Sequence, residues 1–144
     1  MPDSGIREKP KKLPRIIAWV LVVLWAALIF FLSSIPGTGF PSYPEPLNVV
    51  AHFVLYMVLG ILLTRALGYS KMPLWKVALI AIAIASLYGV SDEFPQHYVP
   101  DRIMDPMDWV VDTLGAITGA IVTIFYLSSK KVSRSRKKDA GLKK

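Results

Sequence analysis

Four long apolar runs constrain this chain more than any other feature of its sequence. They cover residues 16–32, 47–63, 74–90 and 109–127. Each is close to the length of about 20 residues that a helix needs to cross the hydrocarbon core of a bilayer. Because backbone groups cannot stay unpaired in lipid, each run is predicted to be a transmembrane helix. The strands of a membrane barrel would be about ten residues long with alternating polarity, and these runs have neither property.

Charged residues are concentrated at the two ends of the 144-residue chain. Residues 1–15 and 130–144 together carry 13 basic and 3 acidic residues, whereas the 114 residues between them carry 4 basic and 7 acidic ones. A soluble domain carries about 25% charged residues, so the central part is too apolar to be one. The composition excludes an ordinary soluble domain, a nucleic-acid-binding fold and a disordered chain. The absence of Cys excludes a disulfide framework, a thiolate metal site and a cysteine nucleophile.

The basic segments predict how the helices are oriented. Lys and Arg favour the cytoplasmic side, and they occur in both tails and around the connection at 66–73. The connection at 34–46 contains no Lys or Arg, and the one at 91–107 contains only Arg102. We therefore predict an all-α, multi-pass protein of the cell membrane, a four-helix bundle with both termini in the cytoplasm. Its parts are a basic tail at 1–15, a membrane domain at 16–127 and a basic tail at 128–144.

The first apolar run has an alternative interpretation as a cleaved signal peptide, because a basic leader precedes it. Its apolar core is longer than the roughly 7–15 residues usual for a signal, and no A-x-A site follows. A retained transmembrane helix is therefore favoured. The basic tail at the other end of the chain is a topology determinant, and it can also attract anionic lipid.

Polar residues of the central part converge on the predicted outer face. All seven of its acidic residues fall there, together with both histidines and Arg102. The start of the second run, the end of the third and the start of the fourth contribute them. Ionisable groups in membrane spans are costly and mark functional sites, so this convergence is the main functional signal. The candidate site residues are His52, Tyr56, Asp92, Glu93, Gln96, Arg102, Asp108 and Asp112.

The fourth run begins with a strong helix start. Asp105 is predicted to be the N-cap and Pro106 the first helical residue, and Asp108 then lies in the first turn, where the helix dipole favours a carboxylate. Asp112 lies one turn deeper, where a carboxylate is expected to face the bundle interior or a water-filled cavity. The residues that share one helical face within about 60° are Asp108, Asp112, Gly115 and Gly119. The spacing of the two glycines is a close-packing motif, so both carboxylates are predicted to face another helix.

The second run carries a polar residue once in every turn. Asn48, His52 and Tyr56 are spaced by four residues, which places them on one slowly drifting stripe. The alternative for His52 is a satisfied packing residue without a function. A histidine beside carboxylates offers ligands to a divalent ion, but no compact ligand motif is present. A hydrogen-bonded network is therefore favoured, and we predict no metal and no other cofactor.

The third run ends in a polar segment. Pro95 disfavours helical geometry at Phe94, so the helix is predicted to end or kink there. Such a break would turn the side chains of Asp92, Glu93 and Gln96 toward the other polar groups of the predicted outer face. The alternative is that the two acids only mark the membrane boundary. Arg102 is expected to bridge carboxylates and lock the following loop, and binding of a substrate phosphate is its alternative role.

These positions resemble the motifs of the VanZ-like family. The second run contains the pattern H-x-x-x-Y-x-x-x-G as His52, Tyr56 and Gly60. The segments 92–96 and 99–102 are similar to the family signature D-E-x-x-Q followed by V-P-G-R. The acidic, Asp-or-Asn, Gly and Gly positions that follow this Arg are matched by Asp108, Asp112, Gly115 and Gly119. The resemblance covers about residues 16–127.

Two departures from the family pattern bear on the polar cluster. Asn48 and Val49 stand where the family often has an Asp-Lys pair, so a charged partner of the cluster is missing. Asp101 replaces the Gly of V-P-G-R, and Asp tolerates left-handed geometry better than most residues. The resemblance implies a small integral membrane protein of the cell envelope. The named member of the family is associated with reduced sensitivity to teicoplanin, a lipoglycopeptide antibiotic, and the resemblance supplies no active site.

Three functions are compatible with these features. The first is a non-enzymatic protein that acts at the outer leaflet on a lipid-linked cell-wall precursor or a lipoglycopeptide, as in teicoplanin-type resistance. The second is an enzyme that acts on a lipid or polyprenyl head group through acid–base or metal chemistry of the outer carboxylates and His52. The third is a carrier linked to protons or cations. In each case membrane lipids are expected partners and nucleic acid is not.

Overall fold

The computed structural model describes residues 12–34, 45–96 and 106–141, and this part of the chain forms four α-helices and no strand. The helices are α1 (Lys12–Ser33), α2 (Glu45–Leu67), α3 (Leu74–Gln96) and α4 (Pro106–Gly141). All four are long and apolar enough to cross a membrane. The prediction of an all-α bundle with four membrane-spanning helices is therefore confirmed.

Two helix ends differ from their predicted positions. Helix α3 does not end at Phe94 but runs on to Gln96, because a proline in the last turn removes one backbone hydrogen bond and leaves the earlier turns intact. Helix α4 begins at Pro106, the predicted first helical residue, and continues to Gly141, far into the basic tail. Lys and Arg are good helix formers, which explains this extension. The predicted cap Asp105 lies outside the described residues.

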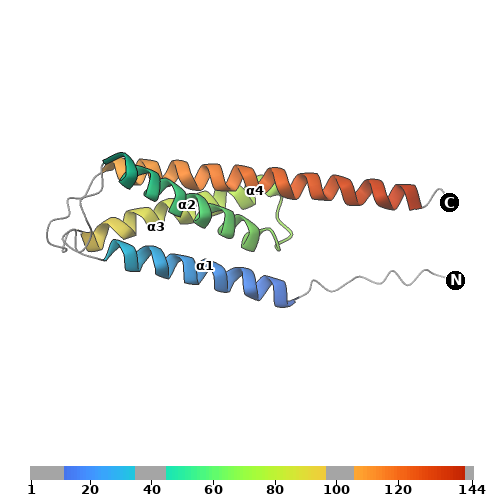
Figure 1. Ribbon diagram of the computed structural model, residues 1–144. Helices are drawn as coiled ribbons and strands as arrows, with labels where there is room; N and C mark the ends of the chain where they lie inside the picture. The colour runs from blue at the N-terminus through green and yellow to red at the C-terminus, as the bar shows by residue number, and fades with distance from the viewer. Residues whose placement is uncertain (1–11, 35–44, 97–105, 142–144) are drawn as a thin grey trace.

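Successive helices run in opposite directions along the bundle (Figure 1). The starts of α2 and α4 and the ends of α1 and α3 therefore lie at one end, and the start of α1 lies at the other. We call the first the acidic end, because it holds Asp108 and Asp112. We call the second the basic end, defined by Arg65 and Lys130. Within the described part, α2 contacts every other helix, most extensively α4, whereas α1 contacts α2 and α3 but not α4.

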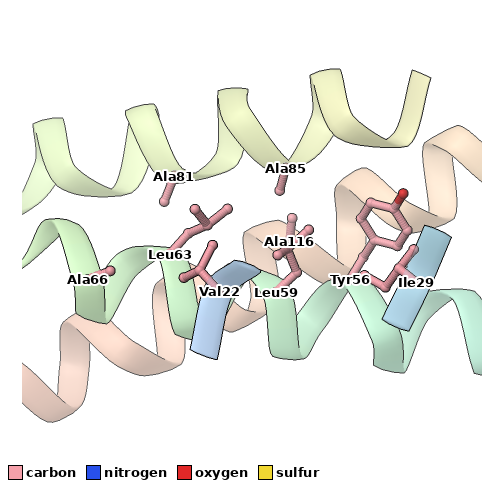
Figure 2. Packing of buried hydrophobic residues seen from close by; sticks show 9 residues of the cluster. All are labelled: Val22, Ile29, Tyr56, Leu59, Leu63, Ala66, Ala81, Ala85 and Ala116. Carbon is pink, nitrogen blue, oxygen red and sulfur yellow. The ribbon is translucent and has the colours of Figure 1, made fainter. Parts of the chain in front are cut away.

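The buried core is narrow and is built largely from small side chains. Figure 2 shows the cluster between the helices, which consists of Val22, Ile29, Tyr56, Leu59, Leu63, Ala66, Ala81, Ala85 and Ala116. Large apolar side chains instead cover the outside of the bundle, including Leu87 and Phe125, which are 70% and 71% exposed. Lipid rather than water suits such a surface, since lipid tails are as apolar as these side chains.

Glycines bring the backbones of α2 and α4 into direct contact. A Cβ atom added at Gly60 of α2 would lie 2.5 Å from the carbonyl oxygen of Ala116. At Gly119 of α4 it would come closer still to the carbonyl oxygen of Met57, and Gly115 is equally restricted. No side chain fits at these three positions, which we call the glycine seam. The seam fixes how α2 and α4 lie against each other.

Helix α1 is attached more loosely than the other helices. Only 17% of its membrane-spanning stretch is buried, compared with 33% for α4. Side-chain hydrogen bonds join it to α2 and α3. The Trp25 indole Nε1 donates to the carbonyl oxygen of Leu55 at 2.9 Å, and the Tyr88 hydroxyl donates to the carbonyl oxygen of Ala26 at 2.7 Å.

Candidate functional site

A histidine of α2 lies between two carboxylates of α4 at the acidic end of the bundle. His52 Nδ1 is 3.1 Å from Asp112 Oδ1, within hydrogen-bond distance. Its other nitrogen, Nε2, is 4.0 Å from Asp108 Oδ2. Asp108 and Asp112 are one helical turn apart, so both reach the same imidazole. We call these three residues the His-Asp cluster.

The two sides of the His-Asp cluster differ in exposure. The Asp112 side chain is 1% exposed, whereas the side chains of His52 and Asp108 are 13% and 14% exposed. A buried carboxylate is costly unless it is paired, so the bond to His52 Nδ1 stabilises Asp112. With Asp112 ionised, Nδ1 carries the hydrogen of this bond. The imidazole is then held with Nε2 on the side that the partly exposed Asp108 occupies.

Helix α3 closes the cluster from a third side. A Cβ atom added at Gly89 would lie 3.4 Å from Asp112 Oδ2 and 3.5 Å from Tyr56 Cε1. Tyr56 is itself 1% exposed, and its ring centroid lies 6.5 Å from that of Tyr88. Gly89 is not among the residues that the sequence predicted for the site. A glycine inside an apolar helical run is the available signal, because it often marks a close approach of another element.

A set of polar contacts joins α3 to α4 beside the cluster. Ser86 Oγ lies 3.0 Å from Thr113 Oγ1, and the Trp109 indole Nε1 donates to Ser86 Oγ at 3.1 Å and to the Ser86 carbonyl oxygen at 3.2 Å. These three residues are likewise absent from the predicted site. Ser and Thr within membrane spans commonly bond across helices, which is the signal that could have identified them.

The predicted site residues whose side chains the structure describes lie close together. His52, Asp108 and Asp112 meet, and Tyr56 is buried one turn further along α2. Asn48, predicted to share their stripe, is exposed. Residues spaced by four drift by about 40° per step around a helix, so Asn48 lies about 80° around α2 from Tyr56. The predicted drifting stripe therefore begins at an exposed residue and ends at the buried Tyr56.

Other predicted site residues fall where side chains are not described. Asp92, Glu93 and Gln96 belong to the last turns of α3 at the acidic end, and their side chains lie outside the described part. Arg102 and Asp101 lie outside the described residues altogether. Among the side chains that are described, no group of three or more His, Cys, Asp or Glu is arranged to hold a metal ion.

Comparison with known proteins identifies the family. The family model described as VanZ/LLP1 matches residues 18–127, which include all of the His-Asp cluster and the glycine seam. Searches of curated proteins and of solved structures find no match. The family match covers well over half of the chain and confirms the resemblance seen in its motifs. This membrane protein belongs to the VanZ/LLP1 family.

Proposed function

We propose that this protein acts at the outer leaflet of the cell membrane, where the His-Asp cluster recognises a lipid-linked ligand or a lipoglycopeptide of the teicoplanin type. The observation that carries the proposal is the geometry of His52, which binds the buried Asp112 and turns its other nitrogen to the partly exposed Asp108. Ionisable side chains are energetically costly inside a membrane bundle, and those that occur there typically mark a functional site. A polar site at one end of the helices is also within reach of a head group.

The proposal includes an orientation, with both termini in the cytoplasm. It is supported by the exposed cations of the basic end, because Lys and Arg favour the cytoplasmic side. Reporter fusions after Lys144 and within the turn at 68–73 should both behave as cytoplasmic. An external signal from either fusion would place the His-Asp cluster at the inner leaflet and overturn the proposed site of action.

Substitution of the carboxylates tests recognition. In cells that express the protein and are challenged with teicoplanin, Asp108→Asn and Asp112→Asn should each reduce protection by a graded amount. One charged hydrogen bond contributes about 1.5–3 kcal/mol at most, and the amide keeps the shape of the side chain. Asp139→Asn is the matched control, since it removes a carboxylate far from the cluster. Abundance of each variant in the membrane is measured in parallel, and full protection by both cluster variants would contradict the proposal.

An enzyme acting on a lipid head group is the second candidate, and one observation favours it. The buried carboxylate of Asp112 binds Nδ1 of His52, and Nε2 faces the more exposed side of the cluster. This arrangement orients a histidine for proton transfer. Catalysis predicts that His52→Gln lowers turnover by about 10²-fold or more while ligand binding survives. It also predicts a lipid-linked product that disappears in this variant. A graded loss with unchanged lipid composition supports recognition alone.

A further inference from the structure

The basic end of the bundle collects all the Lys and Arg side chains that the structure describes. All are exposed, and none forms a salt bridge with another described residue. They are Arg15, Arg65, Lys71, Lys76 and Lys130. The two described carboxylates, Asp108 and Asp112, lie at the opposite end (Figure 1). The basic end is therefore a positive surface without internal counter-charges among these residues.

Two of these lysines lie over exposed aromatic rings. Lys76 Nζ lies 5.3 Å from the centroid of the Trp75 ring, and Lys130 Nζ lies 5.7 Å from that of Tyr126. Both distances fit a cation–π contact. The rings are 60% and 55% exposed, and Trp and Tyr side chains favour the level of the lipid head groups. Each ammonium group is therefore expected at the depth where lipid phosphates lie.

The turn between α2 and α3 adds to the same surface beside α4. A Cβ atom added at Gly68 would lie 3.3 Å from Leu127 Cδ1, so the end of α2 lies against α4 one turn before Lys130. Tyr69, which is 42% exposed, follows directly, and the exposed Lys71 comes two residues later. This corner again combines lysines with exposed aromatic rings.

We propose that the basic end binds anionic phospholipid, with the lipid phosphate held by the lysines that are seated on Trp75 and Tyr126. A topology signal needs cations only somewhere near the helix ends, and it does not need them fixed on interfacial rings. Lys binds phosphate as a point charge, and the exposed apolar flanks of α3 and α4 accommodate the acyl chains. This binding is independent of the ligand at the acidic end, because the two sites face opposite membrane surfaces.

The test is selective retention of lipid by the full-length protein. The protein is extracted with detergent from vesicles of equal phosphatidylglycerol and phosphatidylcholine, and the lipids that stay bound are counted by native mass spectrometry. Phosphatidylglycerol should be enriched. Lys76→Gln and Lys130→Gln should each reduce the enrichment by about fivefold, the effect expected for one basic residue near an anionic surface. The matched control is Lys143→Gln combined with Lys144→Gln, which removes charge without altering either ring pair.

Two further variants separate a built site from general charge. Trp75→Leu keeps the charge of Lys76 but removes the aromatic ring beneath it, and this variant should also lower the enrichment. Lys76→Arg keeps a cation over the ring and should retain the enrichment. The proposal fails if wild-type protein shows no enrichment, or if the control loses as much as the two lysine variants. None of these outcomes depends on antibiotic protection, so the proposed function stands or falls separately.

Discussion

Helix α4 is held against α2 by direct backbone contact, whereas α1 is held by side-chain hydrogen bonds such as those of Trp25 and Tyr88 and is little buried. The difference matters because lipid provides no hydrophobic force between helices, so association depends on close packing and hydrogen bonds. The glycine seam admits only one arrangement of its two backbones. The attachment of α1 rests on contacts that can be lost one at a time.

The two interfaces also differ in what they position. Gly115 of the seam contacts the backbone of Phe53, the neighbour of His52, and lies one turn after Asp112. The seam therefore sets the distance between the histidine and its carboxylate. Damage to the seam should reach the His-Asp cluster, while damage to the hydrogen bonds of α1 should leave the cluster intact.

The largest effect is expected from filling the seam. Gly119→Leu should lower the free energy of unfolding by about 3 kcal/mol or more, because its side chain would displace the backbone of α2. Gly119→Ala should cost about 1–3 kcal/mol for the same reason. Equilibrium unfolding in mixed micelles measures both values.

Gly89→Ala is the matched control for this prediction. Gly89 is also a buried helical glycine, but the added methyl group would make only ordinary contacts, the nearest at 3.4 Å. Replacing glycine by alanine within a helix gains up to about 1 kcal/mol, so this variant should be neutral or more stable. If both alanine variants behave alike, the seam is not the source of the stability.

A smaller loss is expected from the buried carboxylate. Asp112→Asn should lower the free energy of unfolding by about 1.5 kcal/mol, because the amide weakens a charge-assisted hydrogen bond without changing its shape. Asp108→Asn is the comparison, and it should cost less than about 1 kcal/mol, since Asp108 lies 4.0 Å from His52 and is partly exposed. An equal cost for the two variants would contradict the difference in burial.

The attachment of α1 should be weaker at each contact. Trp25→Phe and Tyr88→Phe each remove one interhelical hydrogen bond, and such bonds contribute about 0.6 kcal/mol on average in membrane proteins. Trp19→Phe makes the same change as the first variant on an exposed part of α1 and controls for it. The free energy of unfolding is measured for all three variants. If Trp25→Phe lowered it as much as Gly119→Ala does, the proposed difference between the two interfaces would be wrong.

The smallest effect is expected on the lipid-facing side of α1. The Phe31 side chain is apolar and 64% exposed, so Phe31→Leu should change the free energy of unfolding by less than about 0.5 kcal/mol. A larger loss in the same micelle assay would mean that this face packs against another protein surface.

Several features of the fold follow directly from the sequence. The length of each apolar run fixes the four spans, and the 100° step of a helix places Asp112 on the same face as Gly115 and Gly119. The pairing of Asp112 with His52 was less determined, because a helical face predicts contact with some helix but does not identify which one. The structure shows that the contacting helix is α2, which carries His52.

Other contacts have no distinctive sequence signal. Trp25 bonds to the carbonyl oxygen of Leu55, 30 residues away, and every residue of a helix offers the same carbonyl group. The partner of Gly60 likewise depends on the register of α2 against α4, which only packing in three dimensions determines. Regular spacing likewise leaves burial undetermined, because a drift of about 40° per step leaves Asn48 exposed while Tyr56 is buried.

Helix α4 is long enough that the basic residues of its C-terminal part lie at different distances from the end of its membrane-spanning stretch. Its spanning stretch ends at Lys130, and the helix continues through Gly141. At 1.5 Å per residue, the backbone of Lys137 lies about 10 Å beyond that of Lys130 along the helix axis. This exceeds the Debye length of about 8 Å at physiological ionic strength, so the attraction of an exposed charge this far out is largely screened. Lowering the salt to about 10 mM, where the Debye length is about 30 Å, should therefore strengthen the interaction of the distal charges with the bilayer more than that of Lys130.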